Sequence, residues 1–151
     1  MQNEVSFEYV VSIRPKSNLD MAVKYHAPSG HIPAKLALSQ YNHQDITFHF
    51  GVQILEGGLA VIFPSGGDSV ISYQKKGLFG IEPQVYFEKF DKNSPTQGWW
   101  LSVDFARKAE GCRISTLPPS SGSGKVWSVD DGNIGLGSSS HRWEIRKVRD
   151  N

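Results

Sequence analysis

Short runs of alternating apolar and polar residues, separated by glycine, proline and serine, fill most of the chain. Examples are FEYVVSI (7–13), GGLAVIF (57–63) and KVWSVD (125–130). Alternation with a period of two is typical of strands that bury one face. No stretch places apolar residues at i, i+3, i+4 and i+7 for more than two helical turns. The pattern therefore predicts an all-β chain of many short strands joined by turns.

One phrase, a polar residue followed two places later by an apolar one, occurs three times. It reads QDITFHF at 44–50, QVYFEKF at 84–90 and HRWEIRK at 141–147. The same order of elements precedes the second and third phrases: strand, Ser/Gly/Pro turn, strand, tight glycine turn, short strand. This recurrence predicts three internal repeats at about 1–50, 51–90 and 91–151, the first carrying an insertion at 24–33.

Three units of this size, each ending in a Q-x-W-like phrase, resemble the β-trefoil of the ricin-type lectin family. The closest local match is GKVWSVDDGNIGLGSSSHRWEI, followed by LALSQYNHQDITF. Gln44 and Gln84 keep the glutamine of the phrase, His141 replaces it, and Trp143 alone keeps the tryptophan. The resemblance covers nearly the whole chain. It implies one β-trefoil domain over 1–151, in which three pseudo-symmetric repeats form a six-stranded barrel with a hairpin cap.

In such a barrel the three phrases serve the shared core. We expect five apolar side chains to point inward: Ile46, Phe48, Tyr86, Trp143 and Ile145. Of these, Ile46, Tyr86 and Trp143 are expected to meet near the pseudo-threefold axis. A buried amide left without a partner costs about 1–3 kcal/mol. The polar residue of each phrase is therefore expected to bond main-chain groups where the chain turns.

Composition narrows the class of partner and the compartment. The chain has 16 Lys and Arg against 15 Asp and Glu, a net charge of +1. This balance argues against nucleic acid, whose phosphates require a basic surface. No apolar stretch approaches the roughly 20 residues of a transmembrane helix. No signal peptide is visible, and Cys112 is the single cysteine. We expect a cytoplasmic protein, with release by a non-classical route left open.

No motif requires an enzyme, a metal or a cofactor. SSGSGKV (120–126) has Pro119 and Val126 where a phosphate loop needs glycine and Ser or Thr. The five histidines lack metal-ligand spacing, and no G-x-S-x-G elbow is present. Cys112 is interpreted as a small core residue. Trp99 and Trp100 are adjacent, so a strand would turn one ring inward and the other outward.

The resemblance also implies where a sugar would bind. Members of the family use an Asp after the second strand of a repeat, an aromatic residue on the next strand, and an amide before the Q-x-W phrase. The first repeat offers a matching set, to which we add His26: Asp20, His26, Tyr41, Asn42 and Gln44. In the other repeats the Asp position falls at Ser72 and Ser128. The sequence therefore predicts one shallow sugar site, in the first repeat.

Two classes of function remain open. The first is a non-catalytic lectin, similar to the defence lectins, whose partners are glycans or glycoproteins. The second is a protein-binding β-trefoil, such as a protease inhibitor or toxin component, acting through the long segments 24–33 or 91–98. A cytoskeletal or growth-factor-like trefoil is a further option, although the net charge argues against heparin binding. A homo-oligomer is also left open.

Overall fold

The computed structural model describes residues 9–55, 59–65, 69–73, 85–101, 111–117, 125–137 and 141–150. These ranges contain one 3₁₀ helix, η1 (Ile46–Phe48), and strands throughout. The strands are β1 (Tyr9–Pro15), β2 (Met21–His26), β3 (Lys35–Gln40), β4 (Phe50–Ile54), β5 (Leu59–Pro64), β6 (Ser69–Tyr73), β7 (Val85–Lys89), β8 (Trp99–Leu101), β9 (Ile114–Ser115), β10 (Val126–Asp130), β11 (Asn133–Gly137) and β12 (Trp143–Asp150). No helix among the described residues has the length and apolar character needed to cross a membrane.

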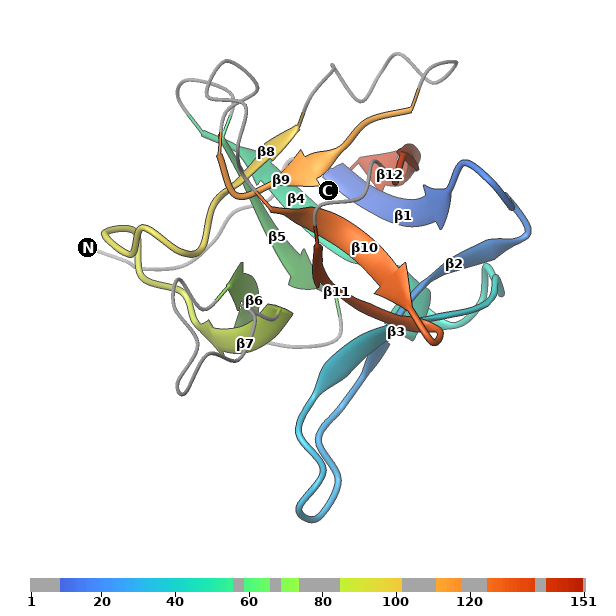
Figure 1. Ribbon diagram of the computed structural model, residues 1–151, viewed down its shortest axis with the longest axis horizontal. Coiled ribbons are helices and arrows are strands. Elements are labelled where there is room, and N and C mark those ends of the chain that lie inside the picture. The colour runs from blue at the N-terminus through green and yellow to red at the C-terminus, as the bar shows by residue number, and fades with distance from the viewer. Residues whose placement is uncertain are drawn as a thin grey trace.

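Six strands form a closed barrel in the order β12-β1-β4-β5-β8-β9, and each neighbouring pair is antiparallel (Figure 1). The ring is completed just before β9, where Cys112 pairs with Trp143. The two residues exchange both main-chain hydrogen bonds, with N···O distances of 2.7 and 2.8 Å. Closure gives the barrel strands partners on both sides, which removes exposed sheet edges.

The remaining strands pair as three antiparallel hairpins, β2–β3, β6–β7 and β10–β11. Each repeat consists of a barrel strand, a hairpin and a second barrel strand: β1–β4, β5–β8 and β9–β12. The β10–β11 turn has positive φ at both Asp131 and Gly132 (54° and 79°). This is the backbone of the two-residue hairpin turn that matches strand twist. The architecture is a β-trefoil, which confirms the predicted fold class.

The pseudo-threefold relation is visible in the residue that opens the fourth strand of each repeat. These residues are Phe50, Trp99 and Trp143, and all three are fully buried. Each pairs with a buried residue of, or just before, the first strand of its own repeat: Val11, Ala60 and Cys112. The repeats therefore meet at these three pairs, around the tryptophan-rich centre of the core.

This relation corrects two of the expected core positions. Phe48, Trp143 and Ile145 are buried as predicted, but Ile46 is 50% exposed and Tyr86 is 37% exposed. Ile46 lies in η1 because Asp45 caps that turn, accepting a hydrogen bond from the N–H of Thr47, so the strand alternation starts later.

The second phrase was also assigned to the wrong strand. Tyr86 belongs to β7, a strand of a cap hairpin, so QVYFEKF is not the counterpart of HRWEIRK. The counterpart is Gln97-Gly98-Trp99, at the start of β8. The strand pairing therefore places the repeat boundaries between β4 and β5 and between β8 and β9, later than 50 and 90.

Gln97 performs the task expected of the polar residue of the phrase. Its side chain is 3% exposed. The amide nitrogen donates to the main-chain oxygen of Lys89 (2.8 Å) and to Glu88 Oε2 (2.9 Å). Its oxygen accepts from the N–H of Asp91 (2.8 Å). Gln44 instead is exposed, and Gln84 lies outside the described residues.

The segment before the fourth strand folds alike in the first two repeats. The side-chain oxygens of Asn42 and Asp91 each accept a hydrogen bond from the N–H two residues later, at 3.0 and 2.9 Å respectively. The main-chain oxygen of each residue also accepts a hydrogen bond from the N–H three residues later, at 3.0 and 2.9 Å. Such Asx turns are local structures set by the side chain itself. The same turn therefore positions Asn42 in the first repeat and Asp91 in the second.

Candidate functional site

The first repeat brings an aspartate and a tyrosine together at the base of its hairpin. Met21 and Gln40 are the first cross-strand pair of β2 and β3. The residues that flank this pair are Asp20 and Tyr41, and the N–H of Tyr41 donates to the main-chain oxygen of Asp20 (2.9 Å). Asp20 is exposed, and its own N–H donates to Asn18 Oδ1 (3.1 Å). The pairing therefore fixes the spacing between a solvated carboxylate and an aromatic ring.

Asn42 and Gln44 follow directly on the exposed turn after β3. The Oδ1 atom of Asn42 accepts from the N–H of Gln44, so this oxygen shapes the turn. The amide N–H groups of Asn42 are the part of the side chain that remains to bind a ligand. Both side chains are exposed. Four of the five predicted site residues, Asp20, Tyr41, Asn42 and Gln44, therefore lie in one short stretch of surface.

His26 does not join them. It ends β2, opposite Lys35, at the far end of the β2–β3 hairpin. Six residues of strand separate it from Asp20, which corresponds to about 20 Å. Figure 1 shows this hairpin projecting away from the barrel. Burial, followed by the charges of Lys24 and Lys35, lowers the pKa of His26.

Three neighbouring side chains contact Tyr41 and hold its ring in place. The guanidinium carbon of Arg14 lies 3.9 Å from the ring centroid. The ring meets Phe48 edge to face, with centroids 5.5 Å apart. The hydroxyl lies 3.1 Å from His43 Nδ1. Tyr41 is only partly exposed, so a sugar would meet a rigid ring whose one face already carries a cation.

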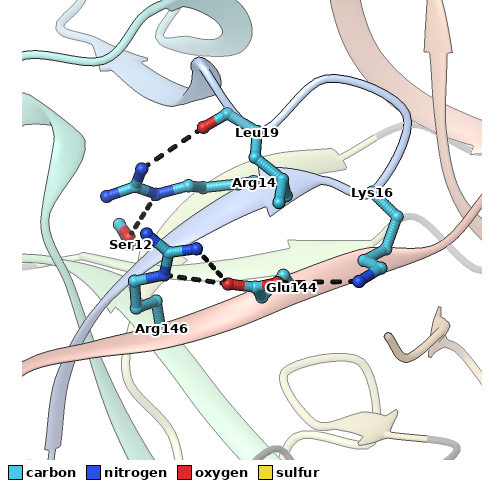
Figure 2. Close-up of polar contacts among 6 residues, drawn as sticks. All are labelled: Ser12, Arg14, Lys16, Leu19, Glu144 and Arg146. Carbon is cyan, nitrogen blue, oxygen red and sulfur yellow. Dashed lines mark hydrogen bonds and ion pairs between the residues drawn. The ribbon is translucent and has the colours of Figure 1, made fainter. Parts of the chain in front are cut away.

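Arg14 is the site residue that the sequence analysis missed. It donates from Nε to Ser12 Oγ (3.1 Å) and from Nη1 to the main-chain oxygen of Leu19 (3.2 Å), as Figure 2 shows. These bonds tie β1 to the turn that carries Asp20. The available signal was the alternation in β1, because Val11 and Ile13 face the core and Arg14 must therefore face outward.

A second polar group lies beside Arg14 on the same face of the barrel. Arg14 pairs across the strands with Glu144, and Ser12 pairs with Arg146. Glu144 is 6% exposed and is bound by Arg146 through Nε and Nη2, while Lys16 Nζ lies 3.7 Å from its other oxygen. Figure 2 shows Arg146 and Lys16 at this carboxylate, whereas Arg14 is directed toward Ser12 and Leu19.

His43, the residue after Asn42, lies near a second histidine, His49. The rings of His43 and His49 are 5.7 Å apart, and His49 is 7% exposed. Burial, with the charges of His43 and Arg149, lowers the pKa of His49. Hydrogen bonds from Thr47 lower the pKa of Asp45, which also pairs with Lys24 at 3.6 Å. No three His, Cys, Asp or Glu side chains in the described ranges converge as metal ligands would.

The corresponding position in the second repeat holds a different arrangement. Ser72 is fully buried, and its hydroxyl lies 2.8 Å from Glu88 Oε2 and 2.9 Å from the main-chain oxygen of Thr96. A hydroxyl sealed in this way is not available to a ligand. In the third repeat Ser128 is partly buried and donates to the main-chain oxygen of Val126 (3.1 Å).

No protein-family model and no curated protein sequence matches the chain. Solved structures do share its fold. A mosquitocidal holotoxin superposes with a TM-score of 0.70 at 14% identity, covering 96% of this chain and 18% of the toxin. The Polyporus squamosus lectin, solved with the glycan Neu5Acα2-6Galβ1-4GlcNAc, gives 0.67 at 9% identity, covering 96% of this chain and 51% of the lectin.

A third similar structure is close to this chain in length. The BEL β-trefoil has a TM-score of 0.64 at 13% identity, covering 96% of this chain and 97% of its own. The chain thus spans less than a fifth of the toxin and about half of the lectin, but nearly all of BEL. At these identities the likeness shows the fold, which lectins and toxins share. The chain is a β-trefoil, and the solved structures that share this fold include both classes.

Proposed function

We propose that this chain is a non-catalytic carbohydrate-binding module with one shallow glycan site in the first repeat. The observation that carries the proposal is the bond from the N–H of Tyr41 to the main-chain oxygen of Asp20. This bond places an exposed carboxylate, an aromatic ring and the exposed amide of Asn42 within one turn of each other. Lectin neighbours with the same fold support the proposal.

The three groups suit a sugar chemically. A carboxylate accepts hydrogen bonds from sugar hydroxyls, an amide nitrogen donates to them, and a ring packs against the apolar C–H face. The site is an open turn, so each contact stays partly hydrated and affinity is expected to be weak. Lectins with weak sites gain avidity when several copies act together. The partners proposed are therefore surfaces rich in glycans or glycoproteins.

A glycan array followed by titration calorimetry tests the proposal. Asp20→Ala is expected to abolish binding, because it removes the acceptor while leaving the main-chain bond to Tyr41 in place. Asn42→Asp keeps the oxygen that shapes the turn and removes the N–H donors, so it should weaken binding about tenfold or more. The matched control is Asp130→Ala, an exposed aspartate in the third repeat. A wild-type chain that binds no glycan contradicts the proposal.

A second candidate function, binding to another protein, is favoured by the tip of the β2–β3 hairpin. Ser29 and Ile32 exchange two main-chain hydrogen bonds of 3.0 and 2.9 Å, and Gly30 has φ of +58°. The result is a tight two-residue turn, bracketed by Pro28 and Pro33. Ile32 is 63% exposed at this tip. A pre-ordered turn with an exposed apolar side chain loses little entropy when it enters a partner's pocket.

The hairpin tip is tested separately from the sugar site. Inhibition of a protease panel, or binding to a protein target, should be lost in Ile32→Ser if the tip makes the contact. Lys92→Ala, an exposed change in the 91–98 segment, serves as control. Glycan binding should be the same in both variants, because the tip lies beyond His26 and is therefore more than about 20 Å from the Asp20 site. Unchanged inhibition in Ile32→Ser would remove the role of the tip.

A further inference from the structure

We infer that the first-repeat site selects anionic sugars, and that Arg14 is the residue that binds the acidic group. The inference rests on the proposed function, because it names the class of glycan that the same site takes. It starts from the charge balance around the Tyr41 ring. The relevant question is which cation on this face lacks an acidic partner.

Arg14 is partly buried and its contacts are neutral. Its partners are the hydroxyl of Ser12, the main-chain oxygen of Leu19 and the ring of Tyr41. A guanidinium has five N–H donors, and these bonds use two of them. Lys16, Lys24 and Arg146 each form an ion pair, whereas no ion pair among the described residues involves Arg14.

The neighbouring cations, unlike Arg14, each have an acidic partner. Arg146 and Lys16 share the carboxylate of Glu144, so each has an anion in contact. Figure 2 shows that Arg14 lies next to this group yet points its guanidinium toward Leu19 instead. Two of the three cations on this face thus share the one carboxylate, and the uncompensated charge is at Arg14.

Geometry places that charge where a sugar would lie. Arg14 stacks on the Tyr41 ring and binds the carbonyl of Leu19, the residue before Asp20. A guanidinium held in a fixed plane pairs with a carboxylate or sulfate through two parallel hydrogen bonds, which an ammonium cannot reproduce. A ligand whose hydroxyls meet Asp20 and Asn42 would carry its acidic group toward Arg14.

Matched pairs of glycans, identical except for one acidic group, test the inference by titration calorimetry. Sialylated, uronic-acid and sulfated sugars are each compared with the neutral parent, and the carboxylated ligands also as methyl esters. We expect the wild type to bind at least one acidic member about tenfold more tightly than its parent or ester. The ester comparison changes the ligand alone, so it stands even where an Arg14 variant folds poorly. Equal affinity throughout overturns the inference.

Variants identify Arg14 as the source of the preference. Arg14→Gln should remove the preference, so that the acidic member of each pair and its neutral parent bind with similar affinity. Arg14→Lys keeps the charge but loses the planar pair of donors, so most of the preference should disappear. Lys92→Gln removes an equal charge from the exposed turn of the second repeat and should change nothing.

The two proposals fail in different ways. Neutral and acidic sugars that bind equally leave the lectin proposal standing and remove this one. A preference that survives in Arg14→Gln also removes it, because another cation would then be responsible. A wild type that binds neither member of any pair removes both proposals.

Discussion

The indole N–H of Trp143 donates to the main-chain oxygen of Trp127 across 3.3 Å, with both rings fully buried. The same bond recurs one repeat earlier, from Trp99 to the oxygen of Ile71 at 2.9 Å. In each case the residue that opens the fourth strand ties itself to the second strand of its own repeat. The two bonds are therefore equivalent under the pseudo-threefold relation, and Phe50 takes the same place without an N–H.

This equivalence predicts the cost of removing one bond. Trp99→Phe should lower the free energy of unfolding by about 2–4 kcal/mol, because it leaves the Ile71 carbonyl without that donor and opens a small cavity. Phe50 shows that a phenyl ring fits the corresponding position of the first repeat. Urea unfolding measures the change. Trp100→Phe, on the adjacent half-buried ring, should cost less than about 1 kcal/mol. A Trp99→Phe chain as stable as the wild type would show that the bond contributes nothing.

The buried amide of Gln97 gives a second prediction. It forms three hydrogen bonds, one of them to the half-buried carboxylate of Glu88. Gln97→Ala should therefore destabilise the chain by about 2 kcal/mol or more, because the N–H of Asp91 loses its acceptor. Gln44→Ala, at an exposed position, should change stability by less than about 0.5 kcal/mol. Similar stability losses in the two variants, measured by urea unfolding, would contradict the assignment of the Q-x-W role to Gln97.

Stability should depend on pH through His49. Burial lowers its pKa in the folded chain below the ordinary value of 6.5. Above pH 6.5 the ring is neutral whether the chain is folded or not, and its contribution is fully present. As the pH falls below 6.5, the unfolded chain takes up the proton first, so folding becomes less favourable. The expected result is a lower urea midpoint at pH 5.0 than at pH 7.5.

Two variants test whether His49 causes this dependence of stability on pH. His49→Phe should reduce the difference between the two midpoints, whereas His31→Gln, at an exposed position, should leave it unchanged. Part of the difference should persist in His49→Phe, because the pKa of His26 is lowered as well. A pH dependence identical to wild type in His49→Phe would exclude His49 as its source.

The single cysteine offers a probe of barrel closure. Burial raises the pKa of Cys112 to about 12, and the residue is 2% exposed. At pH 8 the thiolate is thus a very small fraction of the native chain, whereas an unfolded cysteine has a pKa near 8.5. A thiol reagent should label the native protein orders of magnitude more slowly than the denatured one. Rapid labelling under native conditions would mean that the Cys112–Trp143 junction opens locally.

The missed phrase in the second repeat shows where sequence patterns stop being informative. Both β7 and β8 come just after a glutamine, and both QVYFEKF and QGWW have an aromatic residue two places after it, so both fit the phrase. A one-residue shift in strand register exchanges the two faces of a strand, and the pattern alone does not say which strand is paired with which. Trp99 is in the core because β8 pairs with β5, which is a long-range contact.

In the candidate site, too, the sequence indicated the local contacts but not the long-range ones. Asp20, Tyr41, Asn42 and Gln44 are near one another in sequence once the hairpin is recognised, so their proximity follows from local pairing. Arg14 comes from β1, and it reaches the Tyr41 ring only when β1 packs beside the hairpin. His26 lies away from the other predicted site residues because β2 continues to His26, into the segment 24–33 that was predicted to be a loop.

The sequence by itself determined that the chain is built from short strands in three related units, because alternation and turn residues act locally. It also indicated the β2–β3 and β10–β11 hairpins, whose strands are neighbours along the chain, whereas β7 was taken for a barrel strand. Only the tertiary structure decided which ring occupies the axis, which glutamine is buried and which arginine meets the tyrosine. These outcomes depend on the pairing of distant strands, and the free energy of that pairing comes from the whole closed barrel rather than from any one segment.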